Sequence, residues 1–298
     1  MRFVFLLTCS LAVLMAQEAE TIFRSDAKLV ELHVTVTDKE GRIINGLPQS
    51  AFRVLENDVE QEIKVFRQED APVSLGLVID NSASMTDKRA KVAAAALTLV
   101  RESNPGDEVF IINFNEKPAL VTDFTNNVKQ LESGLTRINP NGQTALRDAL
   151  SVGLEHLKRS GKSDKKVLLV VSDGEDNSSA TDLARLTRDT QKAGVLIYAI
   201  GLLSDASQRE TERAKKDLDT LTQVTGGESF YPTDLGEVDE IAKHVAHDLR
   251  NQYTVAYSPS DTRQDGSFRR LQVTVARPDA VVRTRTGYFS SGATVSSQ

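Results

Sequence analysis

The sequence predicts an α/β protein with a doubly wound, mostly parallel sheet, flanked by a small β-sandwich that N- and C-terminal strands form together. In the middle of the chain, nearly continuous apolar runs alternate with amphipathic helices, which is typical of a parallel sheet covered on both faces. At both ends, short segments alternate apolar and polar residues, which is typical of half-buried antiparallel strands. Neither end region is large enough to form a stable sheet alone, so we expect the two to pair.

The composition is that of an ordinary globular protein. The chain has 298 residues, 40% of them hydrophobic, with 36 basic and 42 acidic side chains and a net charge of −6. This length is sufficient to bury a core. Because phosphate binding needs clustered Lys and Arg, we expect no nucleic-acid partner. The single cysteine, Cys9, excludes an intrachain disulfide and a cysteine-based metal site.

Residues 1–16 are predicted to be a signal peptide. Arg2 precedes an uncharged apolar run, and the small Ala16 stands at the expected cleavage point. Retention of this segment as an anchor is the alternative. Cleavage would leave a cysteine-free secreted or periplasmic protein, which suits a bacterial envelope. No second apolar run of membrane length follows, so we expect no stable membrane span in the mature chain.

Residues 22–70 are predicted to be the N-terminal β-strands. From residue 30 to residue 37, valine and leucine alternate with Glu31, His33, Thr35 and Thr37. We therefore expect one face of this strand to be buried and the face with His33 to point outward. Two further short strands are expected at residues 52–56 and 62–66.

The α/β domain is expected to cover residues 72–252. It opens with the apolar run VSLGLVID at Val73. Further strands are expected at 108–114, 166–174, 195–202 and 228–231, and helices at 88–103, 146–159, 181–193, 212–225 and 236–252. Beyond this domain, residues 253–289 are expected to add C-terminal strands at 253–257, 269–276 and 281–289, which pair with residues 22–70. Residues 290–298 are small and polar and are expected to form a disordered tail.

Polar side chains gather in three loops of the α/β domain. Asp80, Ser82 and Ser84 follow the first apolar strand, Thr144 directly precedes a helix, and Asp173 follows a later apolar strand. In doubly wound sheets, ligands bind at the carboxyl ends of strands where the strand order reverses. These five residues offer only hard oxygen donors, which suit Mg²⁺, with Mn²⁺ or Ca²⁺ as possible substitutes.

The pattern D-x-S-x-S, a distant Thr in a glycine-containing loop and Asp in Ser-Asp-Gly resembles the metal-ion-dependent adhesion site (MIDAS) of von Willebrand factor A (VWA) domains. The resemblance extends from Val73 to about Gln252. It implies direct metal ligation by three hydroxyls, that of Thr144 depending on the conformational state, and metal binding by two carboxylates directly or through water. It also implies that a carboxylate from a protein partner completes the site. The hydroxyls are those of Ser82, Ser84 and Thr144, and the carboxylates those of Asp80 and Asp173.

The flanking strands resemble those of the exported bacterial "VWFA-related" proteins, first described for Acidobacteria. That family has no activity that the resemblance carries over. The resemblance of the flanking strands extends the match to nearly the whole chain that follows the predicted signal peptide.

The favoured function is therefore a metal-dependent, adhesion-type protein-binding module without catalysis. One alternative is a metal-assisted hydrolase, for which Glu175 or Asp176 would be the general base. Another is a structural component of the envelope. Asp80 and Asp173 considered singly are more often turn or helix-cap residues, so the hypothesis depends on all five positions together.

Overall fold

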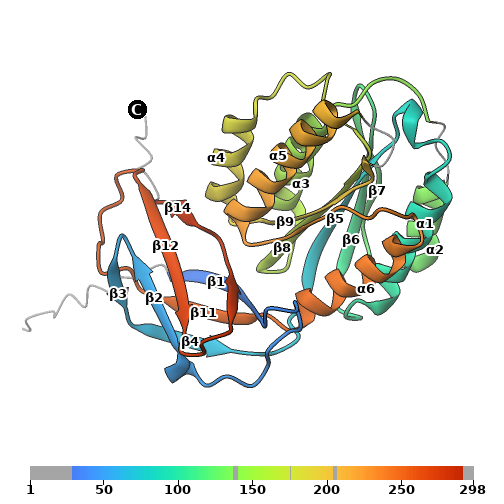
Figure 1. Cartoon of the computed structure of the whole chain (residues 1–298). Coiled ribbons are helices and arrows are strands. Elements are labelled where there is room, and N and C mark those ends of the chain that lie inside the picture. The colour runs from blue at the N-terminus through green and yellow to red at the C-terminus, as the bar shows by residue number, and fades with distance from the viewer. Residues whose placement is uncertain (1–28, 137–139, 175, 204–206, 291–298) are drawn as a thin grey trace, which may run out of the picture.

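The computed structural model of the chain describes residues 29–136, 140–174, 176–203 and 207–290. It consists of an α/β unit, whose sheet is covered by helices on both faces, and a smaller all-β unit beside it (Figure 1). The predicted fold class is confirmed. The predicted signal peptide, and the predicted tail beyond residue 290, lie outside the described residues.

The central sheet has six strands in the order β10-β9-β8-β5-β6-β7. Their bounds are β5 (Val73–Asp80), β6 (Glu108–Phe114), β7 (Pro118–Thr125), β8 (Lys165–Ser172), β9 (Leu196–Gly201) and β10 (Ser229–Phe230). All neighbours are parallel except β6 and β7. The strand order reverses at β5, because the chain first runs outward through β6 and β7 and then returns to β8. The carboxyl ends of β5 and β8 therefore adjoin at a switch point, where such sheets bind ligands.

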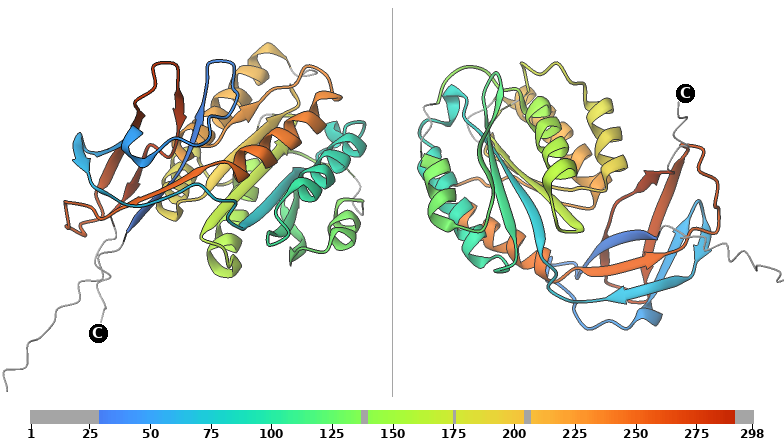
Figure 2. Two further views of the ribbon diagram at one scale, coloured as in Figure 1. Left: turned by 90° about the horizontal axis from the view of Figure 1, so that it is seen from below. Right: turned by 180° about the vertical axis from the view of Figure 1, so that it is seen from behind.

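Two apolar clusters hold helices against the two faces of this sheet (Figure 2). One face carries α1 (Arg89–Glu102), α2 (Val128–Thr136) and α6 (Glu237–Arg250), and the other carries α3 (Leu146–Ser160), α4 (Leu183–Ala193) and α5 (Gln208–Thr225). Every residue of β5 is buried, as expected for a strand covered on both faces. Neither β7 nor α2 is among the elements predicted from the sequence.

The all-β unit is a sandwich of two four-stranded sheets, ordered β13-β1-β11-β4 and β14-β12-β2-β3. Their bounds are β1 (Val30–Thr37), β2 (Phe52–Glu56), β3 (Val59–Gln61), β4 (Ile63–Arg67), β11 (Tyr253–Tyr257), β12 (Phe268–Val275), β13 (Val281–Arg283) and β14 (Gly287–Phe289). Each sheet contains strands from both ends of the chain, since β1 pairs with β11 and β2 with β12. One apolar core lies between the sheets. The predicted joint sandwich is thus present.

The prediction that the polar face of β1 is exposed to water was wrong. The His33 side chain is only 13% exposed. The neighbouring Thr35 is also buried, and its Oγ1 accepts a hydrogen bond from Gln252 Nε2 at 3.0 Å. The α/β unit and the strand connections thus cover a face that an isolated sandwich would expose to water. At the other end of the chain, Ser290 Oγ donates to Asp265 Oδ1 at 2.9 Å, so order continues into the first residue of the predicted tail.

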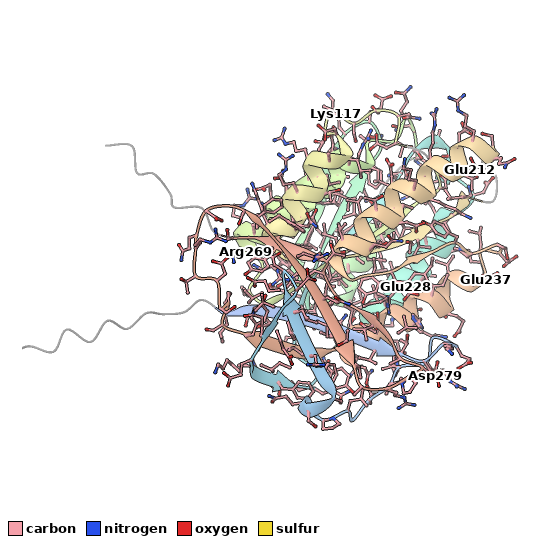
Figure 3. The ribbon with its side chains drawn as sticks, turned by 60° about the vertical axis from the view of Figure 1, so that its left-hand side comes forward. Lys117, Glu212, Glu228, Glu237, Arg269 and Asp279 are labelled. Carbon is pink, nitrogen blue, oxygen red and sulfur yellow. The ribbon has the colours of Figure 1, made fainter. Side chains whose placement is uncertain are left out.

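The sandwich adjoins the amino-terminal end of the central sheet, because only a short segment links β4 to β5 and α6 to β11. Lys117, which follows β6 at the carboxyl end of the sheet, lies far from Asp279 of the sandwich (Figure 3). The carboxyl edge therefore faces away from the sandwich. Within the described part of the chain, no helix is both long and apolar enough to cross a membrane.

Candidate functional site

Asp80 is the last residue of β5 and is completely buried. Its Oδ1 accepts a hydrogen bond from the Ser82 backbone N–H at 2.8 Å, and its Oδ2 accepts one from Ser172 Oγ at 2.6 Å. Burial raises the pKa of Asp80 to about 6 despite these hydrogen bonds, and the nearby Asp173 carboxylate adds to the rise. Among the described ion pairs, none includes Asp80. This carboxylate is thus buried next to a second one without a cation of its own.

A chain of hydroxyl contacts joins the loop after β5 to the loop after β8. Ser82 Oγ lies 3.1 Å from Ser84 Oγ, and Ser84 Oγ donates to Asp173 Oδ1 at 2.8 Å. The short 3-10 helix η2 (Ala83–Met85) produces this arrangement, because Met85 is fully buried and its N–H bonds to the Ser82 carbonyl at 3.1 Å. The turn thereby places the Ser84 hydroxyl on Asp173 and the Ser82 hydroxyl beside that of Ser84.

Thr144 comes from the third loop, which is hydrogen-bonded to the other two. The Thr144 N–H donates to Asn177 Oδ1 at 3.0 Å, and the Asn141 N–H donates to the Asn81 carbonyl at 3.0 Å. A Cβ atom placed on Gly174 would lie 3.9 Å from Thr144 Oγ1, so this hydroxyl lies beside the turn that carries Asp173. The five predicted residues Asp80, Ser82, Ser84, Thr144 and Asp173 therefore adjoin at one edge of the sheet, and we call them the edge site.

Lys88 also lies at the edge site, although it is not among the site residues predicted from the sequence. Its Nζ donates to Asp173 Oδ2 at 2.7 Å, and the two side chains are 8% and 0% exposed. Asp173 therefore shares its two oxygens between Ser84 and Lys88. A lysine is not a ligand for a divalent cation, and 85 positions separate it from its partner, so no short motif could have indicated the pair.

Of the two predicted general bases, Asp176 serves a structural purpose. Its Oδ2 accepts hydrogen bonds from the Arg147 backbone N–H at 2.7 Å and from Ser179 Oγ at 2.7 Å, and it forms an ion pair with Arg147 Nε at 3.1 Å. The side chain is 2% exposed. These contacts join the start of α3 to the loop after β8 and leave no free carboxylate to activate water. Glu175 lies outside the described residues.

The donor set fits a hard divalent cation. In the part of the chain that the structure describes, no group of three or more His, Cys, Asp or Glu side chains could hold a metal. An ion at the edge site would therefore depend on hydroxyl oxygens as well as on the two carboxylates. Oxygen-only ligation suits Mg²⁺, and less specifically Mn²⁺ or Ca²⁺. The buried, uncompensated carboxylate of Asp80 independently favours a cation here.

Asp80, Ser82, Thr144 and Asp173 are buried, whereas the rim of the edge site is open to solvent. Ser84 and residues 141–143 are exposed. A cavity of about 550 Å³ lies at the other end of the α/β unit, where β1 and β14 meet the end of α4, and none of the five edge-site residues lines it. Small-molecule sites usually bury most of their ligand, so an open edge suits a macromolecular partner better.

Comparison with known protein families gives a match in the α/β unit. Residues 75–175 match the sequence model of the von Willebrand factor type A domain. The calcium-activated chloride channel regulator 1 of Bos taurus is 27% identical over an alignment of 172 residues, which covers 52% of this chain. The chain spans only 17% of the length of that protein.

Solved structures extend the likeness in fold. A von Willebrand factor type A structure from Catenulispora acidiphila aligns with a TM-score of 0.54 and 13% identity, over 92% of this chain and 76% of its own. A mutant of the PilB minor pilin from Streptococcus sanguinis aligns with a TM-score of 0.51 and 12% identity, over 74% of this chain and 78% of its own. The first alignment is too long to be confined to the α/β unit, so the shared fold includes part of the sandwich.

Proposed function

We propose that this chain, whose residues 75–175 match the von Willebrand factor type A domain, is a metal-dependent protein-binding module that captures a carboxylate of a protein partner. The observation that carries the proposal is the convergence of five oxygen-bearing residues, from three separate loops, at the exposed carboxyl edge of the sheet. Mg²⁺ bound there would supply a positively charged ligand position that an acidic side chain can fill.

The chain's own residues have distinct parts in this proposal. The hydroxyls of Ser82, Ser84 and Thr144 would hold the ion directly, whereas Asp80 and Asp173 would supply negative charge directly or through water. Hydrogen bonds already orient four of these groups before any ion binds. Few anionic ligands would leave residual positive charge, which is what attracts a carboxylate.

The proposal is binding without catalysis. Metal-assisted hydrolysis needs a base that can activate water. The described candidate, Asp176, is fully engaged with Arg147 and Ser179. We therefore prefer adhesion to the hydrolase alternative.

The proposal also places the protein in a bacterial envelope or outside the cell. Its basis is the apolar run that follows Arg2, together with the absence of cysteine after residue 9 in the sequence. The edge site points away from the sandwich, so the sandwich can serve as a spacer that leaves the binding edge free for a partner.

Calorimetric titration of the purified protein with MgCl₂ and MnCl₂ tests the metal site. We expect saturable binding by the wild type and its loss in Asp80→Asn, because a neutral amide cannot supply the negative charge. Asp189→Asn is the matched control, since Asp189 is a partly exposed acid on α4 and its loss should leave the binding unchanged. Equal heats from wild type and Asp80→Asn would contradict the proposal.

The partner is tested separately by affinity capture from a cell-envelope extract, with and without EDTA. Partners that bind through the edge site should be lost in EDTA and in Asp80→Asn. If EDTA leaves the captured proteins unchanged, the structural alternative is favoured.

A further inference from the structure

Lys88 occupies a position that is unfavourable for a lysine. It is the N-cap residue of α1, where the helix dipole is positive and where Ser, Thr, Asp and Asn are preferred. Its side chain makes no capping hydrogen bond, and the first turn of α1 contains no acidic residue that would offset the charge. It is also 8% exposed, although lysine is rarely buried unless it is paired.

Lys88 contacts the edge site through Asp173. Lys88 Nζ donates to Asp173 Oδ2 at 2.7 Å, while Asp173 Oδ1 accepts from Ser84 Oγ at 2.8 Å. Lys88 therefore sets a full positive charge directly behind one of the two carboxylates of the edge site. Local features that cost stability and gather at one place often mark a functional site.

We propose that Lys88 is a positioning residue that makes metal binding at the edge site depend on a carboxylate ligand. This inference rests on the proposed function. The ammonium group repels a divalent cation bound near Asp173, so it weakens cation binding when no partner is present. The same charge attracts an anionic ligand that approaches the loaded site, so it strengthens the last step of assembly.

The charge of Lys88 weakens cation binding and strengthens carboxylate binding. These opposite effects make the affinity for the cation depend on the carboxylate. With Lys88 present, the cation binds weakly alone and more tightly when a carboxylate joins it. By thermodynamic reciprocity, the cation then increases the affinity for the carboxylate by the same factor. Without Lys88, the cation would bind well whether or not a carboxylate is present.

The test uses Mg²⁺ as the probe, with acetate as the carboxylate and acetamide as its neutral isostere at equal ionic strength. In Lys88→Met and Lys88→Gln, we expect the affinity for Mg²⁺ in acetamide to rise about tenfold, because one charge is removed within roughly 8 Å of the ion. The gain in affinity on changing from acetamide to acetate should fall about threefold below that of wild type. Lys88→Arg keeps the charge and should behave like wild type.

The possible results distinguish failure of the Lys88 inference from failure of the proposed function. If wild type binds Mg²⁺ and the neutral variants bind it equally well, the Lys88 inference is wrong and the proposed function stands. If neither wild type nor the neutral variants bind Mg²⁺, the proposed function fails and the inference fails with it. Thermal unfolding by circular dichroism reports folding, and if both neutral variants are unfolded, Lys88 is a structural residue and the inference is overturned.

Discussion

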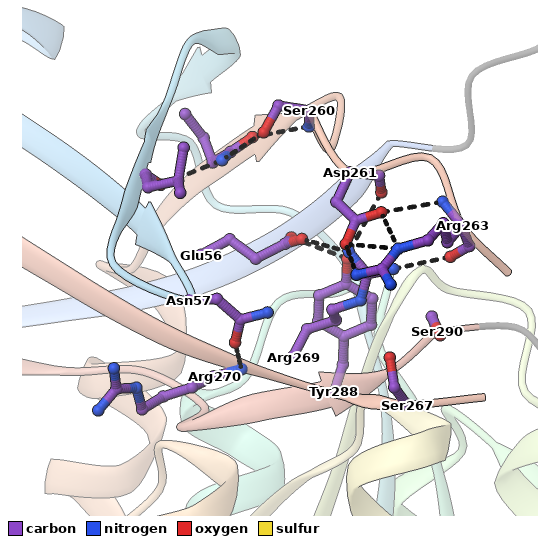
Figure 4. Close-up of polar contacts among 12 residues, drawn as sticks. Glu56, Asn57, Ser260, Asp261, Arg263, Ser267, Arg269, Arg270, Tyr288 and Ser290 are labelled. Atoms are coloured by element: carbon purple, nitrogen blue, oxygen red, sulfur yellow. Dashed lines mark hydrogen bonds and ion pairs between the residues drawn. The ribbon is translucent and has the colours of Figure 1, made fainter. Parts of the chain in front are cut away.

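Two clusters of acidic side chains, one in each unit, differ in how far nearby cations compensate their negative charge. In the sandwich, the Glu56 cluster consists of Glu56, Tyr257, Asp261, Arg269 and Tyr288. Figure 4 shows Glu56, Asp261, Arg269 and Tyr288. Glu56 accepts hydrogen bonds from Tyr257 at 2.6 Å, from Tyr288 at 2.9 Å and from Arg269 Nη1 at 3.0 Å. At the edge site, Asp80 receives one backbone N–H and one hydroxyl, and no cation.

This difference in charge compensation is what we expect between a cluster that stabilises the fold and a site that binds a cation. Arg269 is 1% exposed and contacts both carboxylates, Glu56 at 3.0 Å and Asp261 at 2.8 Å. Arg263 adds a second ion pair to Asp261 at 2.7 Å, so the two carboxylates face two guanidinium groups. The edge site contains two carboxylates and one described ammonium group, and burial raises the pKa of Asp80. A missing counter-charge beside hard oxygen donors is the reason to expect a cation there.

The largest effect should come from opening the compensated cluster. Arg269→Met leaves Glu56 buried without its cation, and breaking such a pair usually costs about 3–5 kcal/mol of unfolding free energy. Chemical denaturation measures the loss. Arg263→Met is the matched control, because this arginine is 73% exposed and its pair with Asp261 should contribute no more than about 1 kcal/mol. Similar losses from both variants would show that the Glu56 cluster does not depend on its buried arginine.

The second effect is stabilisation of the uncompensated site by a cation. At a Mg²⁺ concentration about a hundred times Kd, the native state should gain about 2.7 kcal/mol, because the ion binds only the folded chain. Thermal unfolding with MgCl₂ and with EDTA measures this gain. Arg269→Met, studied under conditions where it is folded, should keep the same gain, whereas Asp80→Asn should lose it. A gain that survives Asp80→Asn would place the ion elsewhere.

His33 tests a third environment, a buried ionisable group between the two units. Burial, with Lys165 and Arg285 nearby, lowers its pKa from 6.5 to about 3, and Glu31 lies 3.8 Å away without reversing this. A lowered pKa means that the unfolded chain binds the proton first as pH falls, so stability present above pH 6.5 decreases toward pH 3.

Between pH 7 and pH 5, wild type should therefore lose about 2 kcal/mol more unfolding free energy than His33→Gln. Denaturant titrations at the two pH values measure the difference. Parallel losses in the two proteins would mean that His33 becomes protonated in the folded state, and that the boundary between the units is wetter than the structure indicates.

Much of the fold follows from periodicity alone. Strand β6 spans residues 108–114, the range expected from its apolar run, and helix α3 begins at the expected Leu146. The three elements that were missed have weak signals, and one of them, β3, has only three residues. Strand β7 is an edge strand in which no residue is fully buried, and α2 has only nine residues. Helix α5 begins at Gln208 instead of 212, and the capping box of Ser207 and Glu210 was the signal for this earlier start.

The edge site was predictable as a set of donors, because loops after parallel strands meet at one edge. The balance of charges at the edge site was not predictable. The pairing of Lys88 with Asp173, the burial of Asp80 and the engagement of Asp176 by Arg147 all depend on side chains that are distant in sequence. The same limit applies to β1, whose polar face was expected to meet water and is covered by other parts of the chain.

The smallest effect is the sharpest test of the comparison. In the absence of metal, Asp80→Asn should change the unfolding free energy by no more than about 1 kcal/mol, since it removes a costly buried charge as well as one acceptor. The Asn oxygen can still accept from the Ser82 N–H, and the Ser172 hydroxyl can rotate to accept from the amide instead of donating. Denaturation in EDTA measures the change. A loss comparable to that of Arg269→Met would mean that Asp80 is a structural acid like Glu56, and the distinction between the two clusters would disappear.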